Sequence, residues 1–147
     1  YKNLANIISA LNKISQTHQI VLPMHPRTRK IVKSQNIVIS DQIFLIDPVG
    51  YLEMIYLLDN CQFVMTDSGG LQKEAFFFKK PCITLREETE WIELVDNGFN
   101  ILGGADYNRI LKAVNNVNEL KNKNYSIDIY GNGNASELIV TELLRNV

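Results

Sequence analysis

Short apolar runs alternate with amphipathic segments along most of the chain. Between Leu4 and Ile14 the apolar residues recur at helical spacing, and the run Ile20–Leu22 that follows has the length of a buried strand. The same alternation continues almost to residue 120. It predicts further strands at 43–46, 63–65, 82–85 and 99–102, and further helices at 27–35, 51–58, 70–78, 90–96 and around 110–117.

Strands that alternate with helices favour a parallel sheet covered by helices on both faces. The expected fold class is therefore α/β, a Rossmann-like domain of three layers. In such sheets, ligands bind beyond the carboxyl ends of the strands. The loops expected at this edge are Pro23–Pro26, Asp47–Gly50, Thr66–Gly70 and Arg86–Thr89.

The pattern changes after Lys121, where the chain is polar and rich in asparagine as far as Gly133. A last helix is expected beyond it, because Asn134 can cap a helix and Glu137 stands at the spacing of a capping box. We therefore expect one domain over residues 1–147, with a C-terminal tail and helix over 121–147. The first residue is Tyr1 rather than Met, which suggests that a longer protein contains this chain.

Composition narrows the class of protein. Hydrophobic residues make up 46% and charged residues 21%, which predicts a folded core, and the net charge of −1 does not favour a nucleic-acid surface. No apolar run approaches 18 residues and no signal peptide is visible, so we expect no membrane span and a cytoplasmic location. Cys61 and Cys82 lie in apolar runs and are interpreted as reduced core residues. The sequence shows neither a cluster of metal ligands nor a nucleophile triad.

The segment Val64–Ala75 has the clearest chemical pattern. An apolar strand leads into Ser68, Gly69 and Gly70, and a helix follows. Glycines let backbone N–H groups approach an anion, and the start of a helix adds unpaired donors and a positive dipole end. This arrangement predicts a cradle for a diphosphate. The alternative is an ordinary tight turn with a serine or aspartate cap.

Three side chains are candidates to complete this site. Glu74 follows the glycines by one helical turn and can accept two hydrogen bonds from a ribose diol, unless it simply faces solvent. His25 directly follows a strand and can donate to a phosphate or, when protonated, polarise a leaving group; otherwise it is a loop histidine. Arg86 can reach a phosphate with two donors or pair with Glu87 or Glu90.

Several segments together resemble the bacterial non-hydrolysing UDP-N-acetylglucosamine 2-epimerases. The resemblance extends from about residue 20 to residue 140. The matching segments are Met24–Arg27, Leu45–Pro48 with Tyr51 and Leu52, Thr66–Ala75, Lys80–Cys82, Leu85–Trp91 and Tyr130–Ala135.

This resemblance implies the C-terminal half of a glycosyltransferase-B-like enzyme, in which the ligand lies between two Rossmann-like halves. Members of the family interconvert UDP-N-acetylglucosamine and UDP-N-acetylmannosamine by eliminating UDP and adding it back, without a metal or redox cofactor. Their general acid and base carboxylates lie in the N-terminal half. The resemblance therefore implies a UDP-sugar ligand, an N-terminal domain as partner, a homodimer for the whole protein, and a role in making precursors of cell-surface polysaccharides.

The resemblance also assigns roles to residues. It places the diphosphate at Ser68–Gly70, the ribose hydroxyls at Glu74, and His25 in the active site near the phosphates. The loop that contains Val49, together with the helix after it, corresponds to the uracil contact, and Met54 stands where some members have an aromatic residue. Met54 can still pack on a ring through its thioether.

One departure bears on the sugar. Trp91 stands where the family pattern has an arginine, which suggests a subgroup that acts on a modified sugar such as a 2,3-diacetamido uronic acid. Two other classes stay open. A retaining glycosyltransferase of the related fold commonly has a Glu-x7-Glu pair, but the residue eight after Glu74 is Cys82. A non-catalytic nucleotide-binding module is the other alternative.

Overall fold

The computed structural model describes residues 2–145, and helices and strands alternate in it in the predicted order. Every element predicted from the hydrophobic pattern is present, and the α/β fold class is confirmed. The elements are α1 (Lys2–Ile14), β1 (Ile20–Pro23), α2 (Pro26–Ser34), β2 (Ile43–Ile46), α3 (Tyr51–Asn60), β3 (Val64–Thr66), α4 (Gly69–Phe77), β4 (Cys82–Thr84), α5 (Ile92–Asp96), β5 (Asn100–Leu102), α6 (Tyr107–Lys121) and α7 (Ala135–Arg145).

The strands are all parallel, but backbone hydrogen bonds divide them into two sheets instead of one. β1 pairs with β2, and β3, β4 and β5 form a second sheet in that order. Side chains join the two sheets, because Ile7, Ile20 and Met65 each pack against both of the core clusters that flank this junction. The hydrophobic pattern identifies buried strands without stating which strands pair, so the division could not be predicted from it.

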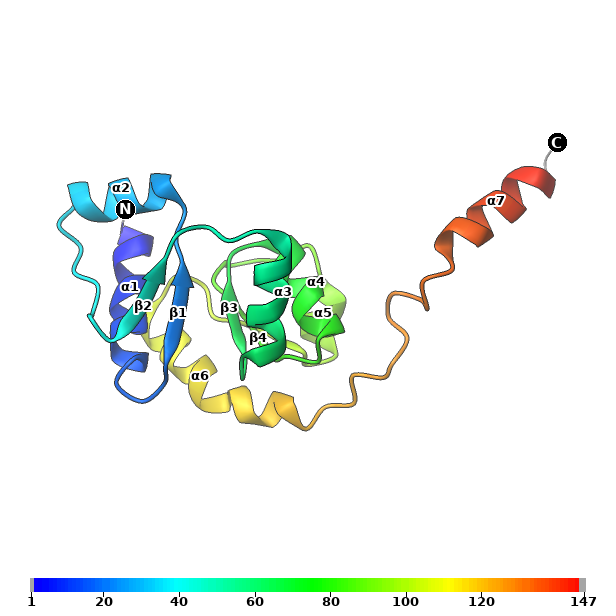
Figure 1. The fold of residues 1–147 in the computed structure, drawn as a ribbon. Coiled ribbons are helices and arrows are strands. Elements are labelled where there is room, and N and C mark those ends of the chain that lie inside the picture. The colour runs from blue at the N-terminus through cyan, green and yellow to red at the C-terminus, as the bar shows by residue number, and fades with distance from the viewer. Residues whose placement is uncertain (1, 146–147) are drawn as a thin grey trace.

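Helices cover both faces of the β3–β4–β5 sheet (Figure 1). Ile83 of β4 packs with Ile110 and Val114 of α6 on one face. Its neighbour Cys82 points to the other face and packs with Ala75 of α4. This alternation follows from the two-residue period of a strand. The carboxyl edge of the sheet, where β3 leads into α4, therefore lies between the layer that contains α4 and the layer that contains α6.

The β1–β2 pair has helices on only one face, which corrects the expectation of full cover. Ile43 and the inward side of β1 pack against α1 and α2. Val21 and Phe44, which are paired in register, are 43% and 56% exposed on the outer face. The reason is that α3 packs instead on the β3–β4 side, where Leu58 is buried with Val64.

The C-terminal tail first follows the domain and then leaves it. Tyr125 and Ile129 pack on the cluster formed by Phe76, Leu94 and Phe99. Beyond them α7 extends away from the other elements (Figure 1), and it has no buried residue although Leu138, Ile139 and Leu143 are apolar. Within residues 2–145, none of the helices is both long enough and apolar enough to cross a membrane.

Candidate functional site

The glycine turn between β3 and α4 is an open helix start. Ser68 caps α4: its Oγ accepts from the N–H of Leu71 at 3.5 Å, and its own N–H donates to Thr66 Oγ1 at 3.0 Å. No residue in the described part of the chain accepts a hydrogen bond from the N–H of Gly69 or Gly70. Because the hydroxyl of Ser68 only accepts in these contacts, its proton also remains available. Three donors therefore point out of one helix end.

The two glycines differ in their surroundings. A Cβ on Gly70 would meet only Ser68 Oγ, at 3.9 Å, so the approach to its backbone is open. A Cβ on Gly69 would collide with the carboxylate of Glu90. That carboxylate also forms an ion pair with Arg86, with 2.9 Å between Nη1 and Oε2. Of the two alternatives for Arg86, the structure contains the ion pair, and this pair lies beside the glycine turn.

Gln72 is fully buried and hydrogen-bonds to the glycine turn. Its side-chain oxygen accepts from the hydroxyls of Thr84 at 3.1 Å and Thr89 at 2.7 Å, and from the amide of Asn100 at 3.2 Å. Its Nε2 donates to the carbonyl of Ser68 at 3.4 Å. One side chain thus links α4, the central strand β4, the edge strand β5 and the loop after β4. Sequence reasoning missed this role, because a glutamine within a helical pattern gives no signal of burial.

Trp91 connects the loop after β4 directly to the glycine turn. Its indole N–H donates to the carbonyl of Gly69 at 2.8 Å, and its backbone N–H donates to Thr89 Oγ1 at 3.1 Å. The ammonium of Lys73 lies 4.5 Å from the centre of the Trp91 ring and 4.3 Å from that of Tyr130. Attraction of a cation to two aromatic faces holds the indole in one orientation.

Glu74 is a candidate acceptor one helical turn beyond these donors. It lies four residues after Gly70 on α4, is half-buried, and has neither a hydrogen bond nor an ion pair with any of residues 2–145. Both oxygens of this carboxylate can therefore accept hydrogen bonds from a ligand. Glu74 therefore has the chemistry that a vicinal diol requires.

His25 caps α2 at the carboxyl end of β1. Its Nδ1 accepts from the N–H of Arg27 at 3.2 Å, so the ring proton lies on Nε2, which is free to donate. The neighbouring loop after β2 is attached to α2 as well, because Arg29 forms an ion pair with Asp47 at 2.9 Å.

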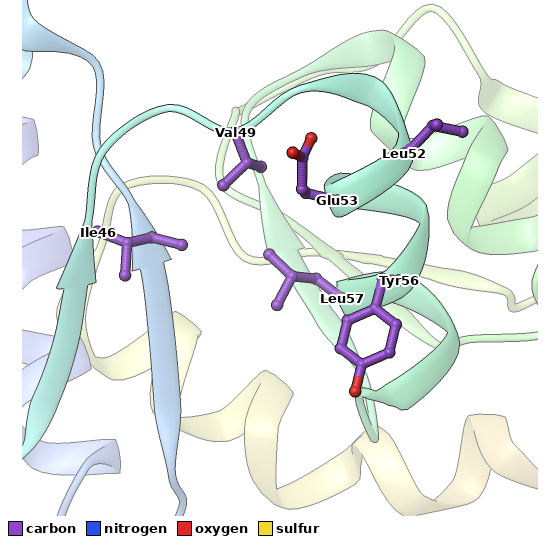
Figure 2. A pocket seen from close by; sticks show the side chains of 6 residues that line it. All are labelled: Ile46, Val49, Leu52, Glu53, Tyr56 and Leu57. Atoms are coloured by element: carbon purple, nitrogen blue, oxygen red, sulfur yellow. The ribbon is translucent and has the colours of Figure 1, made fainter.

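Val49 lines an apolar pocket between the end of β2 and α3 (Figure 2). The pocket has a volume of about 320 Å³, and Glu53 is its one charged lining residue. In Figure 2, Val49 and Leu57 point toward the β1–β2 pair. Met54, the other predicted uracil contact, is half-buried on α3 and does not line this pocket.

The structure thus brings Ser68, Gly69, Gly70 and Arg86 together around one helix start, with Glu74 one turn along the same helix. His25 and Val49 stand at the ends of β1 and β2, on the other sheet. Within residues 2–145, no group of three or more histidine, cysteine or acidic side chains could hold a metal ion.

Comparison with known proteins identifies the family. The family model described as UDP-N-acetylglucosamine 2-epimerase matches residues 1–144. A UDP-N-acetylglucosamine 2-epimerase homolog from Methanococcus maripaludis is 47% identical over 99% of the chain, and 41% of that relative is covered. The UDP-2,3-diacetamido-2,3-dideoxy-D-glucuronate 2-epimerase of Pseudomonas aeruginosa is 46% identical over 97% of the chain, and 40% of it is covered.

Solved structures agree. The chain superposes with a TM-score of 0.84 on the UDP-GlcNAc 2-epimerase of Methanocaldococcus jannaschii in complex with UDP-GlcNAc and UDP, at 38% identity over 98% of this chain and 41% of that one. The chain therefore spans about two fifths of the length of the relatives it matches. These matches agree with the glycine turn and its serine cap, and they establish that the chain belongs to the UDP-N-acetylglucosamine 2-epimerase family.

Proposed function

We propose that this chain is the UDP-binding half of a non-hydrolysing 2-epimerase, which interconverts UDP-N-acetylglucosamine and UDP-N-acetylmannosamine by eliminating UDP and adding it back. The observation that carries the proposal is the start of α4, where the N–H groups of Gly69 and Gly70 have no acceptor in the described chain. An anion is the ligand that such a helix end binds best.

The remaining roles follow from position. Glu74 accepts from the ribose hydroxyls, since its carboxylate has no partner among residues 2–145. His25 offers Nε2–H to the phosphates or to the leaving-group oxygen. Val49 contacts the uracil from the pocket beside α3, and Met54, which lies on α3 outside the lining of that pocket, is the second proposed uracil contact. Arg86 reaches the diphosphate if it leaves Glu90.

Elimination requires removal of the C2 proton and departure of UDP from C1. The donors at Ser68–Gly70 stabilise the negative charge that develops on the diphosphate as the C1–O bond breaks. The carboxylates that remove and return the C2 proton are assigned to the N-terminal domain of the same protein. The chain is then a single UDP-binding domain, with the tail and helix over 121–147 attached to it.

The exposed apolar side chains of α7 support that partner. Leu138, Ile139 and Leu143 are each at least 60% exposed on one helix. Apolar surface of this kind is usually covered by another part of a protein. We assign the cover to the N-terminal domain, and we place the whole protein in the cytoplasm as a homodimer.

A second candidate substrate is a UDP-2,3-diacetamido uronic acid. Two observations favour it: Trp91 replaces the arginine of the family pattern, and the relative from Pseudomonas aeruginosa that is named for such a sugar is 46% identical. The family assignment favours an epimerase over the related glycosyltransferases, which leaves the sugar substituents as the main alternative.

The test uses the longer protein that contains this chain. It is incubated with UDP-N-acetylglucosamine in heavy water, and in parallel with the diacetamido uronate, and proton NMR follows C2. Deuterium at C2 with formation of the 2-epimer supports the proposal, and the faster substrate identifies the sugar. Hydrolysis without deuterium at C2, or no change with either sugar, would contradict it.

A further inference from the structure

The peptide between Gly69 and Gly70 determines where one of the diphosphate donors points. In a trans peptide the C=O and N–H bonds point in opposite directions, so the orientation of the Gly69 carbonyl fixes that of the Gly70 N–H. Both flanking residues are glycines, which have the widest conformational freedom of any residue. This peptide also lies in the first turn of α4, where helices fray. Rotation of this peptide would turn a carbonyl oxygen toward the anion.

Outside the backbone hydrogen bonds of α4 itself, the donor to that carbonyl within residues 2–145 is the indole N–H of Trp91, at 2.8 Å. Two further contacts position Trp91. Its backbone N–H donates to Thr89, which itself donates to the buried Gln72 at 2.7 Å, and the ammonium of Lys73 lies over the indole ring. The edge of the ring is therefore fixed relative to α4 before any ligand arrives.

We propose that Trp91 is a positioning residue for the diphosphate: its indole N–H holds the Gly69 carbonyl so that the Gly70 N–H faces the ligand. This inference rests on the proposed diphosphate site. It assigns to Trp91 a function in a position where the family pattern has a different residue. The proposal also states which part of the Trp91 side chain matters: the indole N–H, and not the aromatic surface, controls the affinity for the anion.

The decisive variant is Trp91→Phe, which removes the N–H group and keeps most of the ring. Loss of one hydrogen bond to a neutral group corresponds to an affinity about two- to tenfold lower. We expect this loss for UDP in calorimetric titrations, whereas the affinity for uridine, which has no phosphate, stays the same. A matched control is Tyr125→Phe, which removes a ring-borne donor from the same aromatic cluster at 3.5 Å from the carbonyl of Leu120. It should change neither affinity.

A second pair of variants tests the support of the indole. Thr89→Val removes the hydroxyl between Trp91 and Gln72 at similar volume, and Thr89→Ser keeps it. We expect Thr89→Val to lower UDP affinity selectively and Thr89→Ser to restore it. A purely structural role would lower both affinities together with the melting temperature.

An NMR measurement on the parent protein avoids the problem of a variant that fails to fold. Trp91 is the only tryptophan, so its indole N–H gives a single signal in a 15N-correlated NMR spectrum. Binding of an anion at the Gly70 N–H polarises the shared peptide and strengthens the bond from Trp91, because linked hydrogen bonds reinforce one another. UDP should therefore shift this signal downfield and slow its exchange with water, and uridine should not.

The outcomes separate this inference from the proposed function. Failure of the parent protein to bind UDP contradicts the proposed function. Binding of UDP to the parent with no change at the indole, or equal UDP affinities of the parent and Trp91→Phe, overturns the positioning role alone. Equal losses for UDP and uridine in Trp91→Phe overturn it as well.

Discussion

At the scale of single residues, the site combines donors without acceptors and an acceptor without donors. The N–H groups of Gly69 and Gly70 lack acceptors in the described chain, and the carboxylate of Glu74, one turn along, lacks donors there. A ligand that satisfies both must be anionic at one end and carry hydroxyl groups near it. A nucleoside diphosphate has this arrangement, which is why neither feature alone is as informative as the pair.

Glu74→Gln tests the acceptor. The amide keeps the size of the side chain but loses the charge and one acceptor, so UDP binding should weaken by about 1–3 kcal/mol. Uridine should lose affinity by a similar factor, because both ligands carry the ribose. Calorimetric titration compares the two, with Glu119→Gln on the far helix α6 as the control. Unchanged affinity for both ligands would remove Glu74 from the site.

Glu90→Gln tests the ion pair beside the turn. The carboxylate of Glu90 lies against Gly69 and occupies Arg86, so its removal relieves repulsion of the anion and frees a guanidinium. Exposed charges contribute little, so UDP binding should tighten about two- to fivefold at low salt and less at high salt. Glu87→Gln is the matched control in the same loop. It breaks the ion pair of Glu87 with Arg109 of α6 and should leave UDP affinity unchanged. Weaker binding in Glu90→Gln would show that Glu90 supports the site.

At the scale of elements, α4 begins with two glycines, which are poor helix formers. The benefit is access: a Cβ at Gly70 would meet nothing of the protein within 3.9 Å, so the space it would fill is the space open to a ligand. If the proposed diphosphate site is correct, UDP binding favours glycine at this position and helix stability favours alanine.

Gly70→Ala should separate the two. Alanine in a helix is more favourable than glycine by up to about 1 kcal/mol, so the variant should melt at a higher temperature than the parent. The added methyl group should at the same time weaken UDP binding and spare uridine. Thermal melts and calorimetric titrations of the same samples check the rise in melting temperature and the fall in UDP affinity. A variant that is more stable and binds UDP as well as the parent would place the anion elsewhere.

The stability of the fold should depend on alkaline pH because of two groups, Cys82 on the central strand β4 and Tyr125 in the C-terminal tail. Burial raises the pKa of the Cys82 thiol from 9.0 to about 12, and burial also raises the pKa of Tyr125 to about 12. The unfolded chain loses these protons earlier than the folded one, so stability should fall as pH rises from about 9 toward 12. Denaturant unfolding at pH 7, 9 and 10.5 measures the slope. Cys82→Ala should make it shallower without abolishing it, and an unchanged slope would contradict the contribution of Cys82.

Sequence patterns predicted the elements well because their signals are local. The glycine turn, its serine cap and the Asn97–Gly98 end of α5 all depend on residues adjacent in the chain, and the structure has Gly98 at φ +72° as such an end requires. The hydrogen bonds of Gln72 and Trp91 join residues 12 to 28 positions apart, which no periodicity reveals. The division into two sheets and the open outer face of β1–β2 are non-local in the same way.

At the scale of the whole molecule, the proposed function makes the chain one wall of a site. It spans about two fifths of the length of its relatives, and α7 exposes an apolar face beyond the domain. In the proposed function, the donors at the glycine turn, Glu74 and His25 bind UDP, whereas no pair of carboxylates among the described residues is assigned to C2 of the sugar. Chemistry at C2 needs groups within about 2.6–3.2 Å of the reacting atoms.

The isolated chain should therefore bind UDP-sugars weakly and leave them unchanged. Absence of the second wall also leaves water in the site, which weakens each electrostatic contact there. Incubation of UDP-N-acetylglucosamine with the chain in heavy water, followed by proton NMR, checks this. The longer protein under the same conditions is the positive control. Deuterium at C2 with the isolated chain would show that the chemistry resides in this half.

The central claim is that the start of α4 holds the diphosphate and Glu74 holds the ribose. A crystal structure of the chain with UDP tests it most directly. We predict diphosphate oxygens within hydrogen-bonding distance of the N–H groups of Gly69 and Gly70, with both ribose hydroxyls on the carboxylate of Glu74. UDP bound at another edge of the molecule, or at this edge with its diphosphate away from the glycine turn, would contradict the claim.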